Sequence, residues 1–153
     1  MNAPAHRMKN IFVEGPIQPA FVADSIAKHA SRTNIGAHDL FLGQVRADVI
    51  RTMPLSRVTA IEYSAYQEMA LERMTAIREA AFTQWPQMTC LHVHHSLGII
   101  QAGELCFMVL ASATHRTQAR EAVAWVVDRI KAELPIFGKE LLGEGGHVWK
   151  TNT

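Results

Sequence analysis

The stretch ELCFMVLASATHRTQAREAVAWVVDRIKAELP, residues 104–135, decides the fold class of this chain. Its first part, Glu104 to Ser112, is almost entirely apolar and predicts a buried strand. From Arg116 to Leu134 the apolar side chains recur at helical spacing, and Pro135 ends the predicted helix. The helix stripe consists of Ala119, Val123, Val126, Val127, Ile130 and Leu134. A strand that leads directly into an amphipathic helix indicates a domain with helices packed on a sheet.

The same reading extends outward from this stretch. A second helix is predicted from about Glu68 to Gln84, and a third opens at Pro19. Strands are expected at residues 10–14, 36–46, 58–66 and 89–96, with a short one at 147–150. This order predicts a single α+β domain over residues 1–153, with a largely antiparallel sheet and three main helices. Residues 47–57 are expected to form a mobile loop, and residues 138–153 a flexible tail.

The composition of the chain narrows the classes of function that it can have. The chain has 153 residues, of which 48% are hydrophobic and 19% are charged, with a formal net charge of +1. A domain of this size buries enough surface to fold without disulfides or metals. The balanced charge argues against general nucleic-acid binding, although a local basic pocket is compatible with it.

The two cysteines and the N-terminal segment point to a cytoplasmic protein. Cys90 and Cys106 lie in apolar, strand-like sequence, so we expect buried free thiols rather than a disulfide or redox motif. Residues 1–20 contain no apolar signal-peptide core, and no stretch is apolar enough to span a membrane.

Two short motifs contain candidate anion-binding side chains. Gln44-Val45-Arg46 ends a predicted strand, where the guanidinium group can bind phosphate or carboxylate; an exposed arginine at a strand end is the alternative. His115 and Arg116 begin the last helix, where free N–H groups favour anions; a surface pair without function is the alternative.

Lys131 and Lys139 flank Pro135 and are the candidate catalytic cations. Lys131 lies beside the apolar stripe, so partial burial among other cations would lower its pKa and suit it to acid, base or nucleophilic chemistry. Two lysines near a helix end also simply complement the helix dipole.

His92, His94 and His95 form the remaining polar group. His92 and His94 project to one face of a strand and His95 to the other. No third or fourth ligand is evident at metal-ligand spacing, so we expect core or interface histidines and no metal site.

Six segments in register resemble the large, catalytic subunit of molybdopterin synthase, the MoaE family. They are GAHDLFLGQVR, AIEYSAYQEMA, HSLGIIQAGE, ASATHRTQA, DRIKAELPIFGKE and VWK, and they span roughly residues 10–150. The resemblance implies an α/β-hammerhead fold and a homodimer. It also implies a small ubiquitin-like subunit at each end, which completes a heterotetramer.

The resemblance further implies a sulfurtransferase reaction. The C-terminal Gly-Gly of the small subunit, carried as a thiocarboxylate, enters a pocket of the large subunit, and sulfur passes to cyclic pyranopterin monophosphate to form the molybdopterin dithiolene. It implies no metal or other cofactor in this subunit.

By position, the resemblance assigns substrate binding to Gln44, Val45, Arg46, His115 and Arg116, and catalysis to Lys131. The segment PIFGKE matches a Pro-Phe/Ile-Trp-Lys-Lys/Arg-Glu pattern, which adds Gly138 and Glu140 to the substrate-binding positions. Gly138 stands where a second important lysine is expected. We therefore expect Lys139, one residue later, to swing into its place as the second catalytic lysine.

Two other functions remain compatible with the sequence. One is a docking scaffold that binds the ubiquitin-like subunit without chemistry, and the other is a small-molecule phosphate-binding domain. The retained cations at 46, 115, 116 and 131 favour the enzyme.

Overall fold

A computed structural model describes residues 10–51 and 56–151 of the chain. Within these residues there are three helices and eight strands. In chain order they are β1 (Phe12–Glu14), α1 (Pro19–Ala27), β2 (Ala37–Gln44), β3 (Val49–Ile50), β4 (Ser56–Ala65), α2 (Gln67–Gln84), β5 (Met88–Gln101), β6 (Leu105–Ala113), α3 (Arg116–Glu133), β7 (Ile136–Leu142) and β8 (His147–Trp149). The predicted α+β class with a mainly antiparallel sheet is confirmed.

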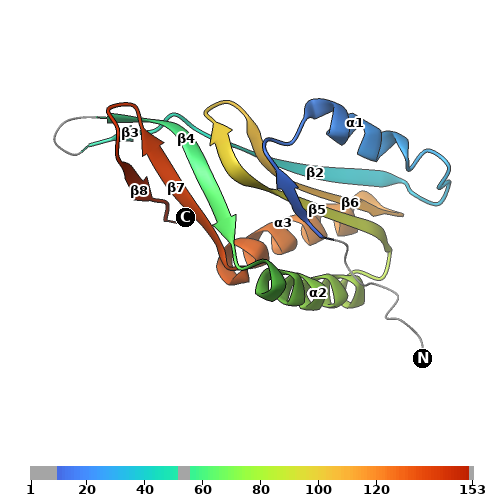
Figure 1. Cartoon of the computed structure of the whole chain (residues 1–153). Helices are drawn as coiled ribbons and strands as arrows, with labels where there is room; N and C mark the ends of the chain where they lie inside the picture. Colours follow the sequence, from blue (N-terminus) through green and yellow to red (C-terminus); the bar gives the residue numbers. More distant parts are fainter. Residues whose placement is uncertain (1–9, 52–55, 152–153) are drawn as a thin grey trace.

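The strands form one sheet in the order β2-β6-β5-β4-β7-β8, in which β3 adds to β4 and β1 pairs with β5 in parallel (Figure 1). The long strand β5 connects the two parts of the sheet. Its first half, residues 88–95, pairs with β6, and its last residues, 98–101, pair with β4. The sheet therefore continues from the helix-covered part to the β4-β7-β8 part without a break.

Helices cover both faces of the first part. Helices α2 and α3 pack on one face, and their core includes Val109 and Ala111 of β6. The alternate residues of β6, Met108 and Leu110, face the other side and pack against Val22 of α1. This alternation follows from the two-residue period of a strand. The helices predicted at 19, 68–84 and 116–134 are confirmed.

The flexible tail expected over residues 138–153 is wrong where β7 forms, whereas the short strand expected at 147–150 is confirmed as β8. Residues 136–142 form β7, which pairs with β4, and residues 147–149 form β8, which pairs with β7. The helix α3 ends at Glu133 because Leu134, before Pro135, adopts an extended conformation, and β7 begins at once. The turn between the two strands contains Gly145 and Gly146, both with positive φ, which suits glycine.

The expected loop at residues 47–57 is also partly wrong. Val49 and Ile50 pair with Ser56 and Arg57, so the segment contains a short antiparallel hairpin; residues 52–55 of that prediction lie outside the described residues. In β4 an irregularity between Val58 and Ala60 breaks the strict alternation expected from the sequence. As a consequence Ile61 and Tyr63 are buried, and Glu62 lies on the other face. Among the described residues no helix is long and apolar enough to cross a membrane.

Candidate functional site

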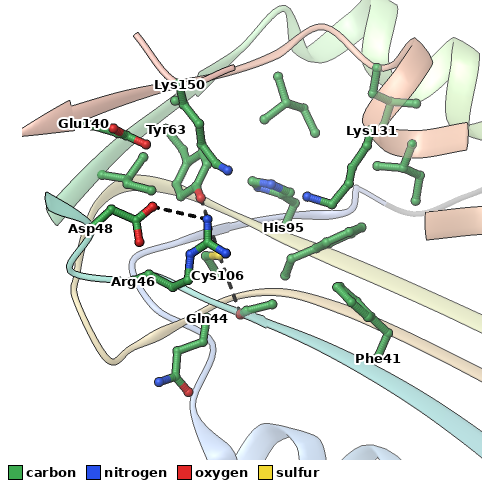
Figure 2. Close-up of a pocket in the computed structure, with 17 residues that line it drawn as sticks. Phe41, Gln44, Arg46, Asp48, Tyr63, His95, Cys106, Lys131, Glu140 and Lys150 are labelled. Carbon is green, nitrogen blue, oxygen red and sulfur yellow. Dashed lines mark hydrogen bonds and ion pairs between the residues drawn. The ribbon is translucent and has the colours of Figure 1, made fainter. Parts of the chain in front are cut away.

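A pocket of about 260 Å³ lies where the C-terminal end of α3 meets β7 and the end of β2. Its wall is formed by residues of β2, β4, β5, β6, α3 and β7, together with Arg46 and Asp48 between β2 and β3, Leu134 after α3 and Lys150 after β8. The charged residues among them are Arg46, Asp48, Lys131, Glu140 and Lys150. Figure 2 shows the ends of Arg46, Lys131 and Lys150 directed into the same space. The pocket thus gathers three cationic side chains at one place.

Lys131 reaches the pocket from the last turn of α3. It is half-buried, and its Nζ lies 5.9 Å from the centre of the Phe107 ring. Burial lowers the pKa of Lys131, and the nearby charges of Lys150 and Arg46 lower it further. A lysine with a lowered pKa gives up its proton more readily than an exposed one, which suits it to general acid chemistry.

Lys150 enters the pocket over Gly138. Its backbone N–H donates to the carbonyl of Gly138 at 2.7 Å, so the residue is fixed beside β7. A Cβ atom built on Gly138 would lie only 3.4 Å from Cβ of Lys150. The Lys150 side chain therefore begins almost where a side chain at residue 138 would begin. Lys150, rather than Lys139, occupies the region where the resemblance predicts a second lysine.

Lys139 points away from the pocket, contrary to the sequence-based expectation. Side chains alternate along β7, so Gly138 and Glu140 line the pocket while Lys139 lies on the opposite face. There its Nζ forms an ion pair with Oε1 of Glu62 at 3.5 Å and lies 5.5 Å from the Trp149 ring centre. A swing into the pocket would require Lys139 to cross the sheet.

Gln44, Val45 and Arg46 come to the pocket at the end of β2. Gln44 and Arg46 line it, and Nη2 of Arg46 forms an ion pair with Oδ2 of Asp48 at 3.2 Å. The Val45 side chain is buried in the core, and its backbone bonds to Glu104 and Gly103 hold the strand end in place. Val45 is therefore a positioning residue and does not line the pocket.

His115 and Arg116 do not reach this pocket. Arg116 is the first residue of α3 and Lys131 lies fifteen residues later, so the two are separated by about 22 Å along the helix. His115 Nδ1 lies 3.0 Å from Oε1 of Gln87, and both His115 and Arg116 are exposed. Within one chain, this pair and Lys131 cannot contact the same small ligand.

The inner wall of the pocket contains three residues that the sequence analysis missed as site residues. The Tyr63 hydroxyl donates to Sγ of Cys106 at 3.5 Å, and the Tyr63 ring meets the His95 ring edge-on at 4.9 Å. Burial raises the pKa of both Tyr63 and Cys106, so both stay protonated at neutral pH. Burial also lowers the pKa of His95 to about 4, so this ring is neutral. The signal for His95 was its place on the opposite strand face from His92 and His94.

Electrostatics decide what the pocket can hold. Three cations and two carboxylates line it, His95 is neutral, and Asp48 is already paired with Arg46. Two adjacent lysines repel a metal cation and attract phosphate or thiocarboxylate groups. The charges of the pocket therefore favour an anionic ligand over a metal cation, and the pKa of one of its lysines, Lys131, is lowered.

Comparisons with known proteins point to one family. The molybdopterin synthase catalytic subunit of Pyrococcus abyssi is 36% identical over 115 residues, which cover 75% of this chain and 74% of the relative. The molybdopterin synthase catalytic subunit of Drosophila persimilis is 32% identical over 92% of this chain, but the match spans only 37% of that longer relative.

A solved structure shows the same fold. The molybdopterin synthase from Staphylococcus aureus superposes with a TM-score of 0.79 at 26% identity, over 94% of this chain and 98% of the other. The sequence profile of the MoaE protein family matches residues 16–133. The chain belongs to the MoaE protein family.

Proposed function

We propose that this chain is the catalytic subunit of a molybdopterin synthase and a sulfurtransferase. The observation that carries the proposal is the convergence of Lys131, Lys150 and Arg46 in one pocket of a MoaE-family fold. The substrate is cyclic pyranopterin monophosphate, and the sulfur donor is the thiocarboxylate at the C-terminal Gly-Gly of a small ubiquitin-like subunit. A cytoplasmic location of the reaction stays a prediction from the sequence.

The transfer requires two bond changes at each sulfur. The thiocarboxylate sulfur forms a bond to a side-chain carbon of the pterin, and an oxygen substituent of that carbon leaves with a proton. Water then attacks the acyl carbon and breaks its bond to sulfur, which leaves a thiolate on the pterin and a carboxylate on the small subunit. No oxidant or reductant is needed, and two such transfers complete the dithiolene.

Lys131 and Lys150 have distinct tasks in this scheme. Lys131 donates the proton to the leaving oxygen, because burial and the neighbouring cations make its ammonium group more acidic. Lys150 binds the negative charge of the phosphate or of the tetrahedral species at the acyl carbon. Arg46 and Gln44 bind substrate, and Glu140 lines the same pocket.

His115 and Arg116 act on the pocket of a second copy of the chain. The resemblance assigns them to substrate binding, and about 22 Å of helix keeps them from the pocket of their own chain. In a homodimer, the exposed start of α3 of one copy can complete the pocket of the other. Each pocket would then combine Lys131 of one chain with the His-Arg pair of its partner.

Reconstitution tests the proposed activity. The purified chain is mixed with a thiocarboxylated small subunit and cyclic pyranopterin monophosphate, and dithiolene product is measured. Product formation supports the enzyme. Binding of the small subunit without product would indicate the docking scaffold, and binding of the pterin phosphate alone would indicate the phosphate-binding domain; either result contradicts the proposal.

Mixed dimers test the shared pocket. Neither Lys131→Met nor a His115→Ala, Arg116→Ala double variant should be active alone. When the two are co-refolded, half of the dimers contain one intact pocket, so activity should return to about a quarter of wild type. Absence of any recovery, with hybrid dimers present, would mean that the pair does not act across the dimer.

A further inference from the structure

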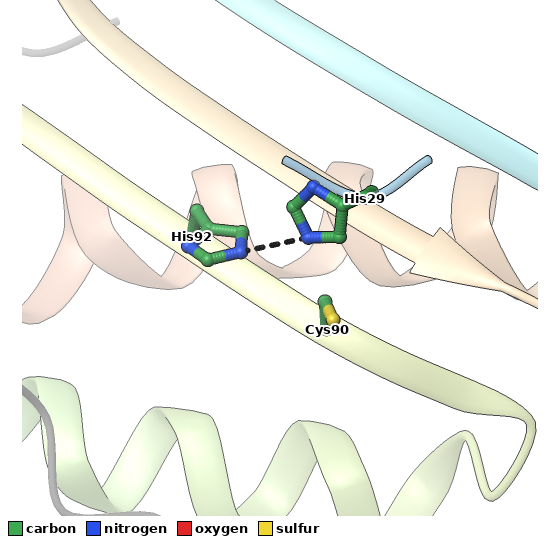
Figure 3. A group of neighbouring side chains, drawn as sticks. All are labelled: His29, Cys90 and His92. Carbon is green, nitrogen blue, oxygen red and sulfur yellow. Dashed lines mark hydrogen bonds between the residues drawn. The ribbon is translucent and has the colours of Figure 1, made fainter. Parts of the chain in front are cut away.

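A second cluster of chemically active side chains lies on the other face of the sheet from the pocket. His29 follows α1, and Cys90 and His92 project from β5 toward it (Figure 3). His29 and Cys90 are buried, and His92 is half-buried. The proposed sulfur transfer uses none of these three residues, because His95, which lines the pocket, projects from the opposite face of β5.

The distances between the three side chains suit a shared ion. Nε2 of His29 lies 3.1 Å from Nε2 of His92, and one ligand atom from each of the three residues lies within 4.8 Å of the others. A tetrahedral zinc with ordinary bond lengths holds two imidazole nitrogens about 3.4 Å apart and a nitrogen and a sulfur about 3.6 Å apart. The 3.1 Å between the two imidazole nitrogens is close to the first of these separations.

The partners of His29 favour metal binding. Its Nδ1 lies 2.6 Å from the carbonyl oxygen of Ser25, which can only accept, so Nδ1 carries the proton. In the neutral ring Nε2 then holds a lone pair, and this lone pair is directed at His92. Metal-binding histidines in proteins are commonly fixed in this manner by a carbonyl on the far nitrogen.

Arg32 acts on the sulfur of the cluster. Its Nη1 donates a hydrogen bond to Sγ of Cys90 at 2.5 Å. The guanidinium group therefore lies against the atom that would bind the metal, and metals bind cysteine as the thiolate. It also adds positive charge, as does Arg78 near His92, so an ion can bind here only if Cys90 supplies its negative charge.

We propose that His29, Cys90 and His92 form a binding site for a metal ion that accepts both imidazole and thiolate, either Zn²⁺ or Cu⁺. These are the ions that a His₂Cys ligand set selects, and water can complete the coordination of zinc. Binding forms two metal–nitrogen bonds and one metal–sulfur bond. Cys90 releases its thiol proton to solvent, and the Nε2 proton that His92 donates to His29 moves to Nδ1 of the same ring, which frees the Nε2 lone pair of His92. The metal keeps its oxidation state.

The site was not predicted from the sequence because it depends on the tertiary fold. His29 is 63 residues away from His92 and comes close only because α1 packs across β5 and β6. The side chain of His92 is partly exposed and provides a path for the ion from solvent.

Metal titration of the full chain, freed of any affinity tag and stripped with a chelator, tests the proposal. One arm uses Zn²⁺ in competition with a chromophoric chelator, and a second uses Cu⁺ under anaerobic conditions. Co²⁺ serves as the spectroscopic probe for zinc. We expect binding of one ion per chain in at least one arm, a thiolate-to-cobalt charge-transfer band, and a rise in Tm with bound metal.

Variants locate the ion. Cys90→Ser should abolish the charge-transfer band, and His29→Gln and His92→Gln should each weaken binding at least tenfold. His94→Gln, on the same face of β5 but packed on Phe21, is the matched control and should bind like wild type. Absence of binding in both arms, or binding that survives Cys90→Ser unchanged, would overturn the proposal. All of these readouts are independent of sulfur transfer.

Discussion

Replacement of Lys150 by Met distinguishes the pocket seen in the structure from the one expected from the sequence. The variant keeps most of the side-chain volume and removes the charge that faces Lys131. A charged hydrogen-bond partner is worth about 1.5–3 kcal/mol, so kcat/KM for dithiolene formation should fall about 10- to 150-fold. Lys139→Met is the matched control, since Lys139 lies in β7 and Lys150 directly follows the adjacent strand β8, but only Lys150 lines the pocket.

The control should behave almost like wild type. Lys139 contacts Glu62 at 3.5 Å, and the two side chains are 30% and 43% exposed. An ion pair this exposed contributes about 0–1 kcal/mol to stability. We therefore expect a small loss of unfolding free energy for Lys139→Met and a change in kcat/KM of less than about twofold.

A pH profile separates a functional role of Lys150 from a structural one. The charge of Lys150 helps to lower the pKa of Lys131, so its removal raises that pKa. Activity that depends on protonated Lys131 is present below this pKa and is lost as the pH rises through it. In a plot of kcat/KM against pH, the fall in activity on the alkaline side should therefore move to higher pH in Lys150→Met. It should stay at the wild-type pH in Lys139→Met.

A lysine at residue 138 should restore part of the lost activity. In the double variant Gly138→Lys/Lys150→Met, the new Cβ lies 3.1 Å from Cγ2 of Ile61 and 3.3 Å from Cε1 of Tyr63. These two side chains must therefore shift by a few tenths of an ångström. The reasoning is refuted if Lys139→Met is the inactive variant, or if Lys150→Met keeps wild-type kcat/KM and its activity falls on the alkaline side at the wild-type pH.

Three further predictions concern catalysis, acid stability and packing. Lys131→Met should abolish sulfur transfer while the small subunit still binds with wild-type Kd by calorimetry; near-normal turnover would remove Lys131 from its role. Because the pKa of His95 is about 4 in the fold and 6.5 in the unfolded chain, its contribution of about 3 kcal/mol is present above pH 6.5 and lost as pH falls to 4. Urea unfolding across this range should show a smaller loss in His95→Gln, whereas the exposed His147→Gln should follow wild type. Gly36→Ala should cost about 1–3 kcal/mol because its Cβ would lie 2.2 Å from the Thr114 carbonyl oxygen, whereas Gly143→Ala, with 3.5 Å to its nearest neighbour, should unfold like wild type.

Helix α3 and the sheet that it covers were predictable because the hydrophobic pattern of each element is local and extends over many residues. The stripe from Ala119 to Leu134 repeats at helical spacing over most of the element, and Pro135 marks the end. Gln44 and Arg46 were also found, because a strand followed by a change of pattern indicates where a strand ends. Lys131 followed from its place beside the stripe.

Of the β7–β8 hairpin, the sequence predicted only the short strand at 147–150, which is confirmed as β8; strand β7 and the hairpin as a whole were not predictable in this way. Its sequence contains Gly138, Gly143, Gly145 and Gly146, and such spacing is typical of loops. The hairpin forms because β7 pairs with β4, more than seventy residues earlier in the chain. Non-local pairing of this kind leaves no periodic signal in the strand itself.

The error over Lys139 has a simple physical cause. Neighbouring residues in a strand point to opposite faces, so a lysine one residue after a pocket position faces away from the pocket. Lys150 replaces it because β8 returns beside β7 and places its end over Gly138. The separation of Arg116 from Lys131, in contrast, follows from the length of α3 and could have been calculated from the predicted helix.

The central claim is sulfur transfer in the pocket of Lys131 and Lys150. The most direct measurement is a single-turnover reaction in which mass spectrometry follows the small subunit and chromatography follows the pterin. We predict one thiocarboxylate converted to carboxylate for each carbon–sulfur bond formed, and neither change with Lys131→Met. Conversion of the thiocarboxylate without sulfur on the pterin, or equal product from wild type and Lys131→Met, would contradict the account.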